Sequence, residues 1–146
     1  MFPLRLKGGQ HLKPVAVEKM NALTIVRERM VHKLDRAELR HKASEAAKKP
    51  GAREVVGKQY QRNEYVAEEA RLRAAGICQL CELPAPFSNK SDQPYLEVHH
   101  VVWLAKGGDD SLENTVALCP NCHRKMHILD LPADKEKLLI KNRSAS

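Results

Sequence analysis

Four cysteines in the C-terminal half of the 146-residue chain form two C-x2-C pairs, Cys78 with Cys81 and Cys119 with Cys122. Two such pairs in a protein of the reducing cytosol are more often metal ligands than disulfides. Four thiolates suit Zn2+ in a closed tetrahedral shell, which is the mark of a structural site. The sequence therefore predicts a structural zinc ion held by these four cysteines.

Four histidines lie beside the cysteines, namely His99, His100, His123 and His127. A zinc finger with two cysteine and two histidine ligands needs about a dozen residues between its second cysteine and its first histidine, whereas Cys122 and His123 are adjacent. Neighbouring residues on a helix also point about 100° apart, which makes one shared ion geometrically poor. We therefore expect the histidines to serve a second site.

The elements that must position these side chains follow from local patterns. Residues 95–102 and 115–119 have strand-like composition, and a helix is expected from residue 120 or 121 to about 130. On that helix His123 and His127, four residues apart, share a face. Consecutive strand residues point to opposite faces, so only one of His99 and His100 is expected to join them. Further helices are expected at 62–75 and 134–141, with a loop at 84–94 and a turn at 106–111.

The N-terminal part is expected to be one helix from Pro14 to about Lys49, followed by a linker at 48–58. Apolar residues recur along it every three or four positions, at Met20, Leu23, Val26, Met30, Leu34 and Ala37. Basic residues lie mostly off that stripe, at Arg27, Arg29, Lys33, Arg36 and Arg40. Two interpretations stay open, a solvated face with an apolar seam for packing or dimerisation, and direct contact with DNA.

The charge of the chain is +7, with 25 basic and 18 acidic residues, and its pI is near 9.4. Residues 1–76 hold 17 basic and 9 acidic side chains, whereas residues 77–146 hold 8 and 9. The positive charge therefore belongs to the N-terminal half and indicates a polyanionic partner. No apolar run is long enough for a membrane span or a signal peptide, so we expect a cytoplasmic protein.

The stretch YLEVHHVVWLAKGGDDSLENTVALCPNCHRKMH, residues 95–127, resembles the HNH nuclease motif, or ββα-metal fold. The order of E-x-H-H, a Gly-Gly-Asp turn, an Asn and C-x2-C-H-x3-H carries the resemblance, which extends over roughly residues 62–130. It is closest to the subgroup with a four-cysteine zinc site, which includes McrA-like modification-dependent restriction endonucleases. The implied fold class is α+β, a small ββα-metal domain with a structural four-cysteine zinc site. Residues 61–146 would form it, with a motif core at 78–127, after a basic helical region at 1–60.

The resemblance also implies roles for individual residues. His100 would be the general base, while the catalytic metal would be held by His99, His123 and His127. Asn114 would tie down the loop between the two strands. Glu97 would either orient an arginine toward the phosphate or be an ordinary surface carboxylate. Trp103 and Leu104 depart from the family pattern, because many relatives have a proline soon after the second histidine.

These assignments predict a metal-dependent endonuclease that hydrolyses phosphodiester bonds of DNA, expected to be double-stranded, in restriction or in a phage-related process. The catalytic ion would be Mn2+, Ni2+, Co2+, Zn2+ or Mg2+, and all-imidazole ligation makes Mg2+ the weakest choice. The rival hypothesis is a non-catalytic zinc-stabilised module that binds nucleic acid. Contacts with DNA are expected from Arg71 and Arg73, the nearest candidate partners of Glu97 in the sequence. They are also expected from Arg124 and Lys125, for which a solvated surface is the alternative. A homodimer through the N-terminal helix is a further expectation.

Overall fold

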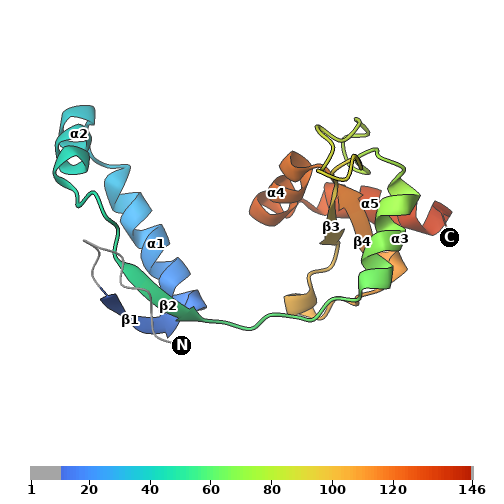
Figure 1. The fold of residues 1–146 in the computed structure, drawn as a ribbon, viewed down its shortest axis with the longest axis horizontal. Helices are drawn as coiled ribbons and strands as arrows, with labels where there is room; N and C mark the ends of the chain where they lie inside the picture. The colour runs from blue at the N-terminus through green and yellow to red at the C-terminus, as the bar shows by residue number, and fades with distance from the viewer. Residues whose placement is uncertain (1–10, 146) are drawn as a thin grey trace. The chain divides into compact units, whose positions relative to one another are not determined.

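The chain divides into two compact units, Met1–Gln59 and Tyr60–Ser146. The computed structural model describes residues 11–145. Among residues 11–145, the first unit contains helices α1 and α2 with strands β1 and β2, and the second contains helices α3 to α5 with the β3–β4 sheet (Figure 1). Within residues 11–145, no helix combines the length and apolar character needed to cross a membrane.

The N-terminal unit is not one continuous helix, so that prediction was wrong. Strand β1 (His11–Ala16) and strand β2 (Ala52–Val56) pair in parallel, and they enclose helices α1 (Val17–Val31) and α2 (Arg36–Glu45) in the sequence. The break after α1 has a local cause, because Asp35 and Glu38 form a capping box that starts a new helix. Pro14 lies in β1, and the segment expected to be a linker contains β2.

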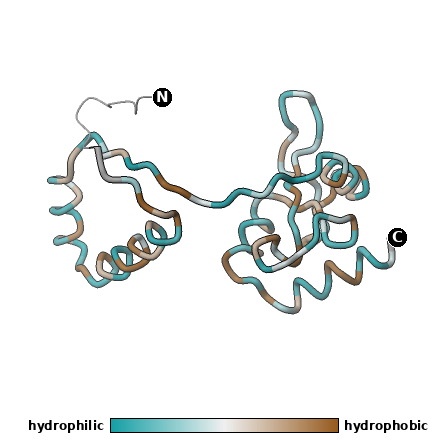
Figure 2. The backbone as a smooth tube through the Cα atoms, turned by 90° about the horizontal axis from the view of Figure 1, so that it is seen from below, coloured by the Kyte–Doolittle hydropathy of each residue, from teal (hydrophilic) through white to brown (hydrophobic). Residues whose placement is uncertain are grey.

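The helices of the N-terminal unit bury none of their side chains within this unit. Val26 and Met30, two members of the expected apolar stripe, are more than half exposed. Figure 2 shows hydrophobic and hydrophilic positions alternating along these elements. Within this unit the apolar stripe of α1 is therefore exposed at Val26 and Met30 and partly buried at Met20 and Leu23.

The C-terminal unit follows the predicted order of elements. Helix α3 (Glu64–Ala74) comes first, then β3 (Glu97–His100) and β4 (Thr115–Leu118), which pair antiparallel, then α4 (Pro120–Leu129) and α5 (Pro132–Ala145). Short 3-10 turns, η1 (Leu104–Lys106) and η2 (Leu112–Asn114), lie between the strands. Helix α5 is longer than the expected 134–141.

Local signals explain the ends of α3 and α4. The Asn63 side chain accepts hydrogen bonds from the backbone of Tyr65 and Val66, which caps the start of α3. Ala75 and Gly76 both adopt positive φ at its end, which a glycine tolerates without strain. Cys119 caps α4, and Pro120 occupies its first position, where a missing N–H costs nothing.

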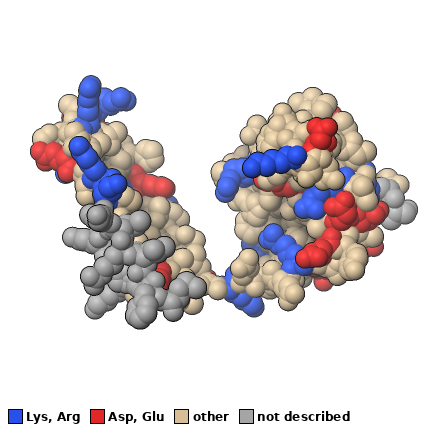
Figure 3. Space-filling model, in the orientation of Figure 1, with Lys and Arg blue, Asp and Glu red and all other residues tan. Residues whose placement is uncertain are grey.

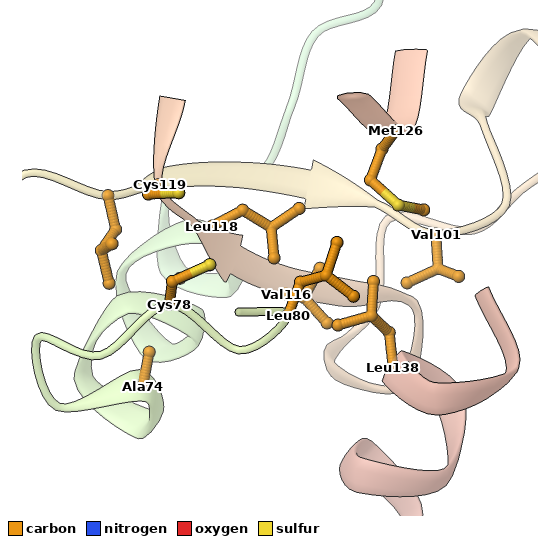
Figure 4. Packing of buried hydrophobic residues seen from close by; sticks show 11 residues of the cluster. Ala74, Cys78, Leu80, Val101, Val116, Leu118, Cys119, Met126 and Leu138 are labelled. Carbon is orange, nitrogen blue, oxygen red and sulfur yellow. The ribbon is translucent and has the colours of Figure 1, made fainter. Parts of the chain in front are cut away.

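The core of the C-terminal unit lies between the hairpin and its helices (Figure 4). Val116 and Leu118 of β4 are fully buried there, together with Met126 of α4. Leu138 of α5 is also fully buried, although it lies beyond the part of the chain that resembles the HNH motif. Helix α5 therefore completes the core that supports the strands.

Candidate metal centre and active site

The four cysteines converge on one point of the C-terminal unit. Their sulfur atoms all lie within 4.8 Å of one another. A Zn–S bond of about 2.3 Å in a tetrahedral shell requires sulfur atoms about 3.8 Å apart, so the cluster fits zinc after small adjustments. The two pairs come from the loop after α3 and from the start of α4, and a bound ion would clamp these segments together.

Hydrogen bonds around the cluster suit thiolate ligands. Burial acts to raise the pKa of the Cys78 thiol, but backbone N–H groups of Cys119, Cys81 and Leu80 lower it to about 7. Burial raises the pKa of Cys122, and its neighbouring cysteines add to the effect. Four sulfurs crowded in this way repel one another as anions, and a divalent cation removes that repulsion.

Two lysines of α5 hold the loop that carries the first cysteine pair. The Nζ of Lys137 donates to the carbonyl of Leu80 at 2.7 Å, and the Nζ of Lys141 donates to that of Gln79 at 2.9 Å. Their positive charges lie beside the site where four thiolates and one zinc would leave a net negative charge. Sequence reasoning missed both residues, and their four-residue spacing on a helical segment was the only signal.

Three histidines form a second cluster. One ring nitrogen from each of His99, His123 and His127 lies within 4.8 Å of the others. The Nε2 atoms of His123 and His127 are 3.1 Å apart, and the ring centroid of His99 lies 5.1 and 5.0 Å from the two helix rings. The structure thus brings together the one strand histidine and the two helix histidines that the sequence grouped.

The chemistry of this cluster fits a metal ion. His99 is 2% exposed, and its buried Nε2 has no hydrogen-bond partner in the described part of the chain. Burial, followed by the neighbouring His123 and His127, lowers the pKa of His99 to about 3. The ring is therefore neutral at physiological pH, and a cation at the cluster would satisfy its unpaired nitrogen.

Glu97 orients one of these histidines. Its Oε1 lies 2.8 Å from Nδ1 of His123, and its Oε2 accepts a hydrogen bond of 2.8 Å from the Tyr95 hydroxyl. The same two hydrogen bonds lower the pKa of Glu97, so it is a carboxylate. A carboxylate only accepts, which places the His123 proton on Nδ1 and frees Nε2 for a metal. Within residues 11–145 no arginine forms an ion pair with Glu97, and the orientation of an arginine toward a phosphate stays a prediction.

His100 points away from the histidine cluster, as strand alternation requires. Its Nε2 lies 2.8 Å from Oδ1 of Asp110, and the other carboxylate oxygen accepts a 2.6 Å hydrogen bond from the backbone N–H of Asn63. Sequence reasoning did not single out Asp110. Its position in the GGDDS turn, between the two strands, was the available signal.

Asn114 ties the loop between the strands to β3. Its amide Nδ2 donates to the carbonyls of Val102 and Asp109 at 2.9 and 2.7 Å, and its Oδ1 accepts from the N–H of Val102 at 2.8 Å. A Cβ at Gly108 would collide with the carbonyl oxygen of Val102, so this loop also requires glycine for its close approach. The loop that carries Asp110 is therefore held at several points.

Trp103 covers another side of the histidine cluster. Its ring centroid lies 5.2 Å from that of His127, and the Nζ of Lys106 lies 4.4 Å from the Trp103 ring centroid. Trp103, one of the two residues that depart from the family pattern, therefore packs against a candidate metal ligand.

The four basic residues expected to contact DNA have different surroundings. The guanidinium of Arg73 donates to the carbonyls of Leu112 and Thr115 at 3.0 and 2.8 Å, so it is used inside the fold. Lys125 forms an ion pair with Asp134 at 3.1 Å. Arg71 forms a long 3.4 Å pair with Glu68 on the surface. Figure 3 shows basic and acidic side chains interspersed on the visible face of the C-terminal unit.

Two hollows adjoin the histidines. A cleft of about 450 Å³ is lined by residues that include His100, Asp110, Glu97, His123, Arg62 and Arg71. A second hollow is lined by Glu97, His123, Arg124 and His127 among others. Of the four basic residues, Arg71 and Arg124 therefore border these hollows.

Residues 78–128, which lie in the C-terminal unit, match the family model described as HNH endonuclease. Over 83 residues, 57% of the chain, the sequence is 46% identical to the type IV methyl-directed restriction enzyme EcoKMcrA of Escherichia coli strain K12. The solved structure of the type IV phosphorothioation-dependent restriction endonuclease ScoMcrA aligns with 59% of the chain, at a TM-score of 0.52 and 31% identity. The chain spans 30% of the first protein and 17% of the second.

Proposed function

We propose that this protein is a metal-dependent endonuclease that hydrolyses phosphodiester bonds of double-stranded DNA. The observation that supports this proposal most directly is the arrangement of the histidines on the two faces of β3. Three imidazole nitrogens converge on one of its faces, while His100 on the other face borders a cleft. A structural zinc site accounts for the four cysteines but not for the histidines. In a purely structural module the cluster of three histidines would have no role.

His99, His123 and His127 would hold the catalytic ion. When bound, a divalent cation there supplies Lewis acidity for the negative charge that develops on the phosphate. Three neutral imidazoles leave its charge uncompensated, and they favour Zn2+, Ni2+, Co2+ or Mn2+ over Mg2+.

The residues of the chain perform the remaining tasks. His100 takes a proton from the attacking water, which a neutral imidazole does well near neutral pH. Glu97 orients His123, and Asn114 keeps the base in place by fixing the loop that follows β3. Arg71 and Arg124 border the two hollows, which supports a role for them in contacting backbone phosphates.

We further propose that cleavage serves restriction of modified DNA. The two relatives named above are described as methyl-directed and phosphorothioation-dependent, and their similarity to this chain supports a target of the same kind. The basic N-terminal unit would add salt-sensitive affinity for DNA that does not depend on sequence.

Cleavage assays test this proposal. The zinc-loaded protein is incubated with Mn2+, Ni2+, Co2+ or Mg2+ and with unmodified, cytosine-methylated and phosphorothioated duplex DNA. We expect nicks or breaks from the wild type, and loss of activity in His100→Ala with unchanged zinc content and folding. His41→Ala is the matched control, because that histidine is exposed and, in the described part of the chain, its ring forms an ion pair with Glu45. Equal cleavage by wild type and His100→Ala across the panel would contradict the assignment.

The absence of cleavage together with retained DNA binding would instead support the rival hypothesis of a binding module. A homodimer through α1 also stays a prediction. Light scattering at several protein concentrations separates a monomer from a dimer.

A further inference from the structure

We propose that Asp110 is a positioning residue that fixes the proton of His100 on Nε2 and leaves Nδ1 as the atom that accepts a proton. This inference rests on the proposed function, since it concerns the histidine assigned as general base. Asp110 touches no reacting group itself and would act through His100.

The geometry supports a strong and directed contact. The Nε2 atom of His100 and the Oδ1 atom of Asp110 are 2.8 Å apart, and His100 is 6% exposed. The second oxygen of Asp110 accepts the Asn63 backbone N–H at 2.6 Å. Both oxygens are thus engaged by donors that lie 47 and 10 residues away along the chain.

The protonation state of Asp110 decides the tautomer of His100. Burial acts to raise the pKa of Asp110, but the Asn63 N–H and His100 lower it overall. The side chain is therefore a carboxylate, which accepts hydrogen bonds and cannot donate them. A short contact with Nε2 consequently requires a proton on that nitrogen, and the lone pair of a neutral ring then lies on Nδ1.

Three segments fix the place of this carboxylate. Asn114 holds the backbone of Asp109, one residue before it. Asn63 binds it from the start of α3, where the helix dipole favours a negative charge. The third segment is β3, whose last residue, His100, contacts the carboxylate through Nε2. Such support is what an oriented base needs, because small displacements of a catalytic group reduce rates strongly.

If Asp110 only joined α3 to the loop, its replacement would leave the tautomer of His100 unchanged. Asp110→Asn keeps the shape of the side chain but has one acceptor oxygen for two donors. If the oxygen keeps Asn63, the amide NH2 faces Nε2 and favours the tautomer with its proton on Nδ1. If the oxygen keeps His100, the amide NH2 faces the Asn63 N–H. Only the first arrangement removes the lone pair from Nδ1.

The experiment reads the tautomer and the rate separately. Two-bond 1H–15N correlation spectra of the full zinc-loaded chain, with 15N-labelled histidine, identify which ring nitrogen of His100 carries the proton. Single-turnover cleavage and DNA affinity are measured on the same proteins. Asp109→Asn is the matched control, since Asp109 is the exposed carboxylate immediately before Asp110.

We expect the proton on Nε2 in the wild type and in Asp109→Asn, and a shift toward Nδ1 in Asp110→Asn. Because a general base contributes about 10²- to 10⁴-fold, the cleavage rate should fall by about 10²-fold with unchanged DNA affinity. Asp110→Glu, which keeps a carboxylate, should restore the Nε2 proton and part of the rate.

A wild-type His100 with its proton on Nδ1 would overturn the inference even if Asp110→Asn failed to fold. An Asp110→Asn protein that keeps the hydrogen bond of the Asn63 N–H, and so turns its amide NH2 toward His100, would overturn it as well if its tautomer and rate were those of the wild type. If the wild type cuts no DNA with any metal, the nuclease proposal fails, while the spectra still decide whether Asp110 sets the tautomer.

Discussion

Replacing Glu97 by glutamine should weaken metal binding at the histidine cluster without disturbing the zinc site. The carboxylate accepts from His123 at 2.8 Å and from Tyr95 at 2.8 Å. A glutamine has one acceptor oxygen, so it cannot serve both donors. If the amide NH2 turns toward His123, it favours the ring tautomer whose proton lies on Nε2, the nitrogen that faces His127.

The size of the effect follows from the position of Glu97 behind a ligand. Loss of such a partner typically costs 10- to 100-fold in metal affinity, which is about 1.4 to 2.7 kcal/mol. The ligand itself remains, so the loss should be smaller than that caused by His123→Ala. Tyr95→Phe removes the other hydrogen bond of Glu97 and leaves its contact with His123, so its affinity should stay close to that of the wild type.

Trp103 provides the assay, because it is the only tryptophan in the chain and its ring lies 5.2 Å from that of His127. Zinc-loaded protein is titrated with Co2+ or Ni2+, which quench tryptophan fluorescence at short range. Elemental analysis confirms that zinc stays in the cysteine site. Equal dissociation constants for the wild type and Glu97→Gln would refute the view that Glu97 orients His123.

Three further outcomes are expected. Elemental analysis should find two metal ions per chain in the wild type, and His127→Ala should retain only one; two ions in this variant would contradict separate sites. Cys119→Ser should lose zinc and unfold the C-terminal unit, as circular dichroism would show, because a domain of this size depends on its metal. Leu138→Ala should lower the free energy of unfolding of the zinc-loaded protein by about 2 to 5 kcal/mol in urea. The half-exposed Ile140, changed to alanine, should cost about 1 kcal/mol or less, and equal losses would refute a core role for α5.

The sequence sufficed where local spacing determines geometry. The four-residue interval between His123 and His127 places both on one helical face, and alternation along β3 separates His99 from His100. Both relations need only the correct secondary structure. The clustering of the two cysteine pairs could also be predicted from the sequence, because two C-x2-C pairs in one domain most often bind a single metal ion together.

The missed features depend on contacts between distant segments. Asp110 meets His100 and Asn63 only when the loop folds over β3, and no periodicity signals that approach. Arg73 looked like a surface base, yet its guanidinium binds carbonyls about 40 residues away in the chain. In the N-terminal unit, the apolar stripe extended across Leu34, but the capping box of Asp35 and Glu38 outweighed it and divided the helix.

The register of one short strand determines whether this site exists. A shift of β3 by one residue would turn His99 toward Asp110 and His100 toward α4, exchanging base and ligand. Two contacts oppose that shift at opposite ends of the hairpin. At one end, Asn114 binds the backbone of Val102, two residues after His100. At the other end, Leu118 pairs with Glu97 and is followed by Cys119, so a zinc ion held by the cysteines would anchor that end. Under the proposed function the cysteine cluster and Asn114 would therefore affect catalysis, because together they would decide which histidine holds the metal and which borders the cleft.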